Sequence, residues 1–283
     1  MNISELIKKK LLYLQSYGVE SSRFELEMLL AAAIGIEKRN LPLWNGILTE
    51  EIINKFETYI KEREKHKPVD KILKQKGFYK YDFAVNEDVL SPRFDTEILV
   101  ERAVDLLKDK NEAKILEFGI GSGCILLSIL ADLPYAEGIG VDISQNALKI
   151  ALQNANYLGV ESRVKMINAS WFDDNIEIKC GNKFDMIISN PPYIPSADIE
   201  NLDNEVKLFD PLIALDGGVD GLRDYRKITQ ISFNLLKPGG LLIFEAGINQ
   251  SMDIAGIGTC NNFELAEITP DLTGIDRCII LKK

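Results

Sequence analysis

A short apolar run followed by closely spaced glycines occupies residues 115–123, which read Ile115-Leu116-Glu117-Phe118-Gly119-Ile120-Gly121-Ser122-Gly123. The apolar run predicts a buried strand, and residues 122–133 predict a helix directly after it. Glycine adopts backbone conformations that other residues avoid, so these glycines permit a sharp turn and a close approach of a ligand to the backbone. The stretch therefore predicts a strand, a turn and a helix that together bind a ligand.

Strands and helices alternate from about Phe94 onward. We expect further strands at residues 138–141, 164–167, 184–189, 241–245, 263–268 and 278–281. We expect helices at residues 96–107 with Asp95 as the N-cap, at 144–158 with Ser144 as the N-cap, and at 221–236. Such alternation predicts an α/β fold with a doubly wound parallel sheet. The last two strands have no long helix between them, so we expect them to form an antiparallel hairpin at one end.

Helical patterns fill the first 65 residues. They predict helices at residues 4–17, from Ser21 or Ser22 to about Gly35, and after Thr49. Strand-like residues at 71–73, 78–79 and 81–85 then predict a hairpin. We therefore expect a small helical N-terminal domain at residues 1–72, a β-hairpin linker at 73–90 and a larger domain at 91–283.

The composition argues against several classes of protein. No apolar run approaches the ~18–20 residues that span a bilayer, and the N-terminus lacks the order of a signal peptide, so we expect a soluble, cytoplasmic protein without membrane contacts. The four cysteines lie far apart and His66 is the single histidine, so we expect no metal site and no Ser-His-Asp or Cys-His mechanism. Residues 1–80 carry 15 Lys and Arg against 11 Asp and Glu, a net charge of +4. Because the whole chain has a net charge of −10, residues 81–283 have a net charge of −14. An acidic body repels phosphates, which argues against DNA as a direct partner.

A carboxylate stands at the end of the next strand, where Asp142 follows Gly123 by nineteen residues. It can accept hydrogen bonds from the hydroxyls of a ribose, so the unit predicts a cofactor that contains a nucleoside. A dinucleotide fingerprint requires a small sixth residue, where this chain has Cys124, so a nicotinamide cofactor fits imperfectly. Trp171 follows the third strand and either flanks an adenine ring or packs in the core.

Two consecutive prolines end the strand predicted at 184–189, within Asn190-Pro191-Pro192-Tyr193. Neither proline donates an N–H group, so the sheet stops and a stiff loop follows. Ligands of open α/β sheets bind at the carboxyl ends of strands, and an amide, fixed carbonyls and an aromatic ring suit a planar group that carries NH2. The alternative is that this tetrapeptide is an ordinary turn.

With both motifs in hand, the chain resembles the HemK/PrmC family of S-adenosylmethionine-dependent N5-glutamine methyltransferases, which modify peptide-chain release factors. The matching segments are residues 90–97, 117–123, 141–144, 170–172, 190–195, 214–222, 238–240 and 271–277. The resemblance implies a seven-stranded, Rossmann-like methyltransferase sheet. It also implies methyl transfer to the side-chain nitrogen of the glutamine in the Gly-Gly-Gln motif of a release factor, in support of translation termination, with S-adenosylhomocysteine as the product.

The resemblance assigns roles to individual residues. The residues implied to bind the cofactor are Glu117, Gly119, Ile120, Gly121, Ser122, Gly123, Asp142, Trp171 and Asn190. The residues implied to be catalytic are Asn190, Pro191, Pro192 and Tyr193. The Asn190 side-chain oxygen and the Pro191 carbonyl would accept the two N–H bonds of the glutamine, while Tyr193 packs on its amide plane.

Ser91, Phe94 and Asp210 depart from the family pattern, so the roles of their loops stay open. We expect a monomer whose helical domain recognises the release factor.

Three other functions are possible. The first is an adenine-N6 methyltransferase of DNA or RNA, which the acidic body disfavours, and the second is a nucleotide-sensing module that binds S-adenosylmethionine without catalysis. The third is a nicotinamide dehydrogenase, which Cys124 and the lack of a catalytic histidine disfavour.

Overall fold

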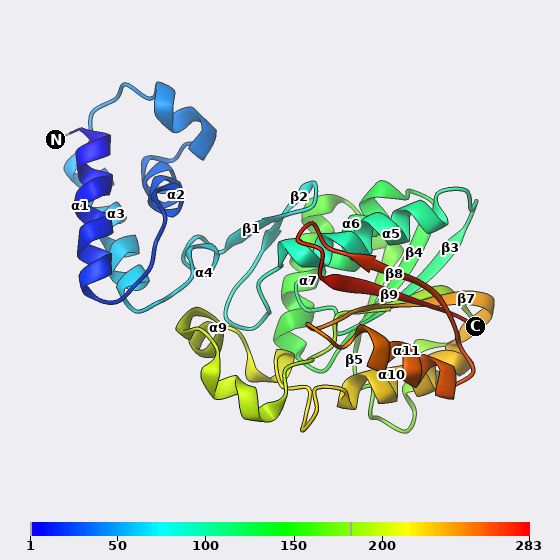
Figure 1. Cartoon of the computed structure of the whole chain (residues 1–283). Coiled ribbons are helices and arrows are strands. Elements are labelled where there is room, and N and C mark those ends of the chain that lie inside the picture. The colour runs from blue at the N-terminus through cyan, green and yellow to red at the C-terminus, as the bar shows by residue number, and fades with distance from the viewer. Residues whose placement is uncertain (1, 182) are drawn as a thin grey trace. The chain divides into compact units, whose positions relative to one another are not determined.

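The chain forms two compact units: residues up to Gln75 together with Asp203–Phe209, and Lys76–Leu202 together with Asp210–Lys283. The structure is a computed structural model that describes residues 2–181 and 183–283 (Figure 1). Over these residues, no helix is long and apolar enough to cross a membrane.

The first unit is helical. Its elements are α1 (Ile3–Ser16), α2 (Arg23–Ile34), the 3-10 helix η1 (Lys38–Leu43), α3 (Glu50–Glu64), α4 (Val69–Leu73) and α9 (Asn204–Phe209). Ser22 caps α2 through a capping box with Glu25, and Gly35 ends the helix in a left-handed conformation, as predicted. The predicted cap at Thr49 is also confirmed, because its side chain accepts from the backbone N–H of Ile52.

The prediction of a strand-like segment at residues 71–73 is wrong, because these residues end the helix α4. Pro68 stands immediately before α4, where its fixed φ favours entry into a helix. Val69 packs into the buried core of the helical unit, and Ile72 and Leu73 pack against that core. Burial of three apolar side chains on one side thus favours a helical turn over an extended segment.

A short hairpin begins the second unit. It joins β1 (Gln75–Phe78) to β2 (Tyr81–Ala84), so the hairpin prediction is confirmed. Phe78 and Phe83 are buried in the same apolar cluster and meet edge to face, with ring centroids 6.0 Å apart. The Tyr81 hydroxyl donates to Asp132 over 2.7 Å, which fixes the hairpin on the second unit.

Seven strands form the main sheet in the order β5-β4-β3-β6-β7-β9-β8 (Figure 1). Their bounds are β3 (Ala113–Phe118), β4 (Ala136–Asp142), β5 (Val164–Asn168), β6 (Phe184–Ser189), β7 (Leu236–Glu245), β8 (Glu264–Pro270) and β9 (Asp276–Lys282). The first five strands are parallel, and β9 pairs antiparallel with both β7 and β8. The predicted doubly wound sheet and its terminal antiparallel hairpin are confirmed.

The remaining helices cover both faces of the sheet or lie in its loops. The α-helices are α5 (Glu97–Leu107), α6 (Cys124–Asp132), α7 (Gln145–Leu158), α8 (Ile176–Cys180), α10 (Arg223–Leu235) and α11 (Ser251–Cys260). The 3-10 helices are η2 (Phe94–Thr96), η3 (Glu161–Arg163), η4 (Ser196–Asn201) and η5 (Leu212–Ala214).

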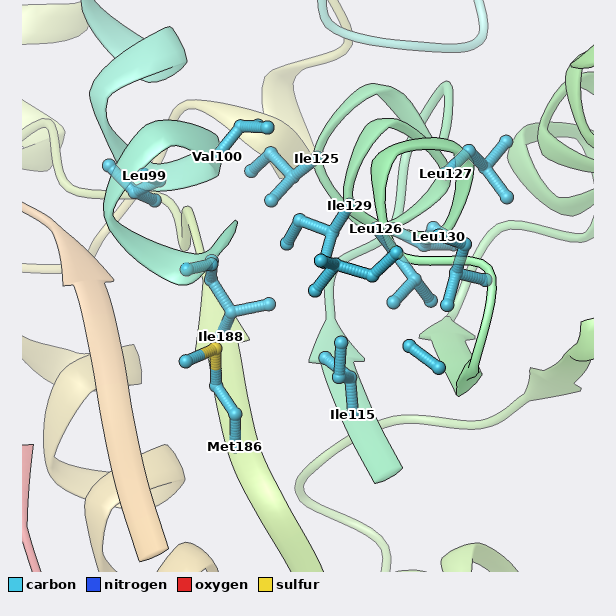
Figure 2. Close-up of a cluster of buried hydrophobic side chains, with 14 of the residues drawn as sticks. Leu99, Val100, Ile115, Ile125, Leu126, Leu127, Ile129, Leu130, Met186 and Ile188 are labelled. Atoms are coloured by element: carbon cyan, nitrogen blue, oxygen red, sulfur yellow. The ribbon is translucent and has the colours of Figure 1, made fainter. Parts of the chain in front are cut away.

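Two buried clusters form the core, one on each face of the sheet. The first joins α5, α6 and α7 to the sheet, and Figure 2 shows Leu99, Ile129 and other side chains of these helices over Ile115, Met186 and Ile188. The second cluster lies under α8, α10 and α11 and includes Ile187. Successive residues of β6 thus enter opposite clusters, because side chains alternate along a strand.

The prediction that Asp95 caps a helix is wrong. Asp95 lies inside the short helix η2, and α5 begins at Glu97 without a capping side chain. The Asp95 carboxylate instead accepts from the Arg277 guanidinium over 3.2 Å. A tertiary contact with a residue far along the chain therefore replaces the local cap.

Candidate functional site

A pocket opens at the carboxyl ends of β3, β4 and β6, where ligands of open α/β sheets bind. It encloses about 810 Å³ when the space open to solvent at its mouth is included. Both motifs singled out in the sequence contribute to its walls.

The glycine-rich turn forms one wall. Gly119, Gly121 and Gly123 all have positive φ, at 77°, 53° and 84°, so side chains would strain this backbone. Gly119 and Ile120 donate their backbone N–H groups to the carbonyl of Val141, which joins the turn to the end of β4. The turn is therefore rigid before any ligand arrives.

Asp142 is tied to this turn by both of its carboxylate oxygens. Oδ2 accepts the N–H of Gly121 over 2.9 Å, and Oδ1 accepts the N–H of Ser144 over 2.8 Å. Burial raises the pKa of Asp142, and these backbone N–H groups oppose the rise. A carboxylate has about four acceptor positions, so Asp142 can still accept two hydroxyl groups of a ligand.

Glu117 adds a second carboxyl group to the pocket wall. Its side chain is almost fully buried, and Oε2 accepts the backbone N–H of Leu126 over 3.0 Å. Burial raises its pKa well above the usual value, and the charge of Asp142 raises it further. Because burial favours the neutral form of Glu117, the charge that can attract a cationic ligand comes from Asp142, beside an aromatic wall.

Trp171 lies at the edge of the pocket and of the core, and its contact with an adenine ring stays a prediction. Its ring lines the pocket and also packs against the second apolar cluster. The indole N–H donates to Asp224 over 2.9 Å, which fixes the ring. A Cβ atom on Gly119 would stand 3.6 Å from this ring, so the indole lies over the glycine-rich turn.

Asn190 leaves the end of β6 and lines the same pocket, as does Pro192. The backbone N–H of Ile194 donates to Leu215, and the Gly217 N–H donates to Ile194, over 3.0 and 2.9 Å. A Cβ atom on Gly217 would stand 2.7 Å from the Pro192 carbonyl oxygen, so only glycine fits beside this loop. The segment 214–222 therefore holds the proline loop in place.

Three of the site residues expected from the sequence, Gly123, Pro191 and Tyr193, do not line the pocket. Gly123 packs the start of α6, since a Cβ atom there would stand 2.5 Å from Leu127 Cδ1. Tyr193 packs against the second apolar cluster, and burial raises the pKa of its hydroxyl. The catalytic roles of Pro191 and Tyr193 stay predictions.

The segment 88–96 supplies pocket residues that sequence reasoning did not assign to the site. Arg93 and Thr96 line the pocket, as does the divergent Ser91. Asp210, another of the three divergent residues, contacts this segment: it accepts the backbone N–H of Ser91 over 3.2 Å and the guanidinium of Arg93 over 2.7 Å. The sequence signal for these residues is the family segment at residues 90–97.

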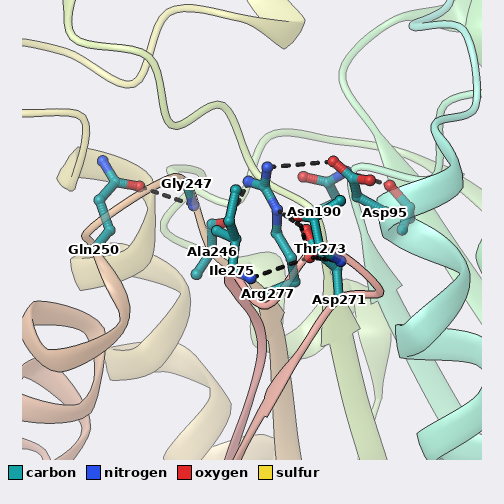
Figure 3. A network of polar contacts seen from close by, with 10 residues as sticks. Asp95, Asn190, Ala246, Gly247, Gln250, Asp271, Thr273, Ile275 and Arg277 are labelled. Atoms are coloured by element: carbon teal, nitrogen blue, oxygen red, sulfur yellow. Dashed lines mark hydrogen bonds and ion pairs between the residues drawn. The ribbon is translucent and has the colours of Figure 1, made fainter.

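A polar network lies near Asn190, in which Arg277 contacts both Asp95 and Asp271 (Figure 3). The Asn190 side chain donates from Nδ2 to the Thr96 hydroxyl over a long 3.5 Å. Glu245 ends β7, is almost fully buried, and has no hydrogen-bond partner for Oε2 among the residues described. Sequence reasoning placed Glu245 in a strand and assigned it no function.

Known families match two parts of this chain. A family described as methyltransferase domain matches residues 109–261, and one described as PrmC N-terminal domain matches residues 5–73. The expected methyltransferase fold is thus confirmed by similarity as well as by topology.

Two bacterial proteins named release factor glutamine methyltransferase are similar over most of the chain. The protein from Rhodospirillum rubrum is 41% identical over 267 residues, which cover 94% of this chain and 80% of that protein. The protein from Geobacter sulfurreducens is 38% identical over 268 residues, which cover 94% and 92%. A solved structure from Streptococcus mutans, described as a SAM-dependent methyltransferase, has a TM-score of 0.52 at 11% identity over 72% of this chain and 53% of that one. This last likeness concerns the fold alone.

Proposed function

Because this chain belongs to the family of release factor glutamine methyltransferases, we propose that it methylates the side-chain amide nitrogen of a glutamine in a peptide-chain release factor. The methyl donor is S-adenosylmethionine, and the acceptor atom is N5 of the glutamine in a Gly-Gly-Gln motif. The observation that carries the proposal is that Asn190 shares one pocket with Asp142 and the glycine-rich turn. An amide-binding group and a nucleoside-binding group thus stand in one cavity.

The residues of the pocket fit the methyl donor. Asp142 has acceptor positions left for the ribose hydroxyls, and Trp171 offers an aromatic face. The Asp142 carboxylate gives the cavity an acidic character, which suits a sulfonium cation that also carries an ammonium group. When bound, S-adenosylmethionine supplies an electrophilic methyl group: the amide nitrogen forms the new C–N bond, the methyl–sulfur bond breaks, and the sulfur keeps the electron pair.

Asn190 and the proline loop would prepare the acceptor. An amide nitrogen is a poor nucleophile because its lone pair is delocalised into the carbonyl group. Acceptors at the Asn190 side-chain oxygen and the Pro191 carbonyl would hold both N–H bonds and stabilise positive charge as it develops on the nitrogen. After transfer, one N–H proton leaves to water. The rigid contacts of this loop with the segment 214–222 support such pre-organisation.

We further propose that residues 1–72 recognise the release factor, that 73–90 link them to the catalytic part, and that 91–283 form the methyltransferase domain. The match of the N-terminal family to residues 5–73 supports the first boundary. We expect the protein to act as a monomer in the cytoplasm, where release factors work, and to need no metal ion.

One experiment tests the function directly. The full chain is incubated with methyl-labelled S-adenosylmethionine and purified release factor, and the labelled peptide is located by mass spectrometry. We expect label on the glutamine of the Gly-Gly-Gln peptide. Label in DNA with none in the release factor would instead support an adenine methyltransferase, and cofactor binding without transfer to any acceptor would support a sensing module.

A further inference from the structure

Glu245 is the buried group that the proposed reaction leaves without a role. It is 1% exposed, and its Oε2 lacks a partner among the described residues, which is costly for a carboxyl group in an apolar interior. β6 and β7 are parallel and pair Ser189 with Phe244, so the next residues along the two chains, Asn190 and Glu245, lie side by side at this edge of the sheet. The carboxyl group with this unpartnered oxygen therefore lies beside the residue expected to bind the substrate amide.

We propose that ionised Glu245 is a positioning residue that sets which end of the Asn190 amide faces the pocket; this inference rests on the proposed function. The physical reason is the direction of hydrogen bonds. An asparagine side chain presents an acceptor at one end and a donor at the other, and the two ends have nearly the same shape. A carboxylate only accepts hydrogen bonds, so it attracts the NH2 end and leaves Oδ1 directed at the substrate.

Thr96 extends this directional chain. The Thr96 hydroxyl accepts from Asn190 Nδ2 over 3.5 Å, so its own hydrogen is free for another acceptor. Thr96 and Asn190 both lower the pKa of Glu245, so both side chains lie close enough to favour its carboxylate form. Glu245 thus ends a chain of hydrogen bonds in which each donor is directed away from the pocket and toward the carboxylate. This direction leaves the acceptor oxygen of Asn190 available for the N–H bonds of a glutamine.

The ionisation of Glu245 should therefore control turnover. Burial raises its pKa to about 7, and Thr96, Arg277 and Asn190 only partly oppose this. A protonated Glu245 can donate to Asn190 and reverse the amide, so turnover should rise as pH rises through about 7.

The other groups that act on Glu245 come from several elements. They are Asp95, Arg277, Tyr193, Tyr225, Cys124 and Cys278. Burial keeps the two tyrosines and the two cysteines neutral at this pH, and Arg277 stays charged.

The test compares Glu245→Gln with the wild type in the release factor assay. Gln keeps the shape of Glu but can donate as well as accept, so we expect kcat to fall about 10- to 100-fold. The affinity for S-adenosylhomocysteine, measured by calorimetry, should stay within about threefold because Glu245 does not line the pocket. The rise of kcat around pH 7 should disappear in the variant. Asp185→Asn is the matched control, because Asp185 is also a buried carboxylate but lies at the opposite end of β6; it should keep the wild-type kcat and pH profile.

A second pair of measurements tests the inference even if the Glu245→Gln variant folds poorly. Thr96→Val removes the intermediate hydroxyl, and the double variant with Glu245→Gln should be no slower than the slower single variant, since both break one chain. Multiplicative losses would contradict the inference, as would a variant kcat within twofold of the wild type. A wild-type kcat that is flat across pH 7 would also overturn it, whatever the variants do. If the wild type fails to methylate the release factor, the proposed function itself fails and the inference with it.

Discussion

Asp142→Asn is the substitution whose effect on cofactor binding follows most directly from the geometry. Each oxygen of Asp142 accepts one backbone N–H, from Gly121 over 2.9 Å and from Ser144 over 2.8 Å. An asparagine offers one oxygen, so its NH2 group must face one of these N–H donors or turn away. It also removes the negative charge that would attract the ribose hydroxyls.

The size of the effect comes from the value of one hydrogen bond to a charged group. Such a bond contributes about 1.5–3 kcal/mol. At ~1.4 kcal/mol per tenfold change, its loss weakens the binding of S-adenosylmethionine about 10- to 150-fold. The asparagine has nearly the same volume, so the pocket keeps its shape and the loss reflects hydrogen bonding.

The assay is titration calorimetry of S-adenosylmethionine with the full chain. Asp220→Asn is the matched control, because Asp220 also accepts the N–H two residues on, from Leu222, but lies outside the pocket. The control should bind the cofactor with wild-type affinity. A dissociation constant for Asp142→Asn within threefold of the wild type would refute the assignment of Asp142 to the cofactor.

Three further predictions concern the proline loop and the stability of the sheet. Gly217→Ala should lower kcat more than tenfold while cofactor affinity stays near wild type, because its Cβ would stand 2.7 Å from the Pro192 carbonyl; Gly256→Ala, with open space around it, is the silent control in the same assay. Asn190→Ala should nearly abolish methyl transfer in the labelled-methyl assay yet keep cofactor binding, and near-normal turnover would contradict its orienting role. Asp185→Asn should lower the midpoint of urea unfolding. Burial would raise the pKa of Asp185, but hydrogen bonds from two lysines and a backbone N–H outweigh it and lower the pKa from 3.8 to about 2. The stability it contributes is therefore complete above pH 3.8 and is lost towards pH 2, so the two midpoints should converge over that range, and a constant difference would argue against this pairing.

Local rules explain the parts of the fold that the sequence predicted well. Ser22 and Ser144 cap their helices because a cap depends on a backbone N–H only three residues away. The apolar run at residues 184–189 forms β6 with the predicted bounds, since a strand buried on both faces reads as continuous apolar sequence. The glycine-rich turn is also predicted well, because its positive φ angles depend on its own glycines and not on a distant partner.

The wrong predictions share a different cause. Asp95 has the side chain of an ordinary helix cap, but its carboxylate accepts a hydrogen bond from Arg277, which lies 182 positions further along the chain. Residues 71–73 look strand-like alone and become helical because the helical unit buries them. β7 begins at Leu236, before Pro238, because its pairing with β6 shifts register between Phe184 and Met186. In each case a distant partner outweighs a local preference.

The sequence by itself determined the reaction class, the glycine-rich turn, Asp142 and the proline loop with Asn190, because each of these motifs is written in consecutive residues. Only the tertiary structure decided what stands around them. It ties Asp210 to Ser91 and Arg93, brings Thr96 into the pocket, and buries Glu245 beside Asn190. Strand order brings Glu245 to Asn190, since β6 and β7 are neighbours in the sheet although residues 190–235 lie between them in the sequence. A residue whose role depends on the end of a neighbouring strand carries no signal in its own segment.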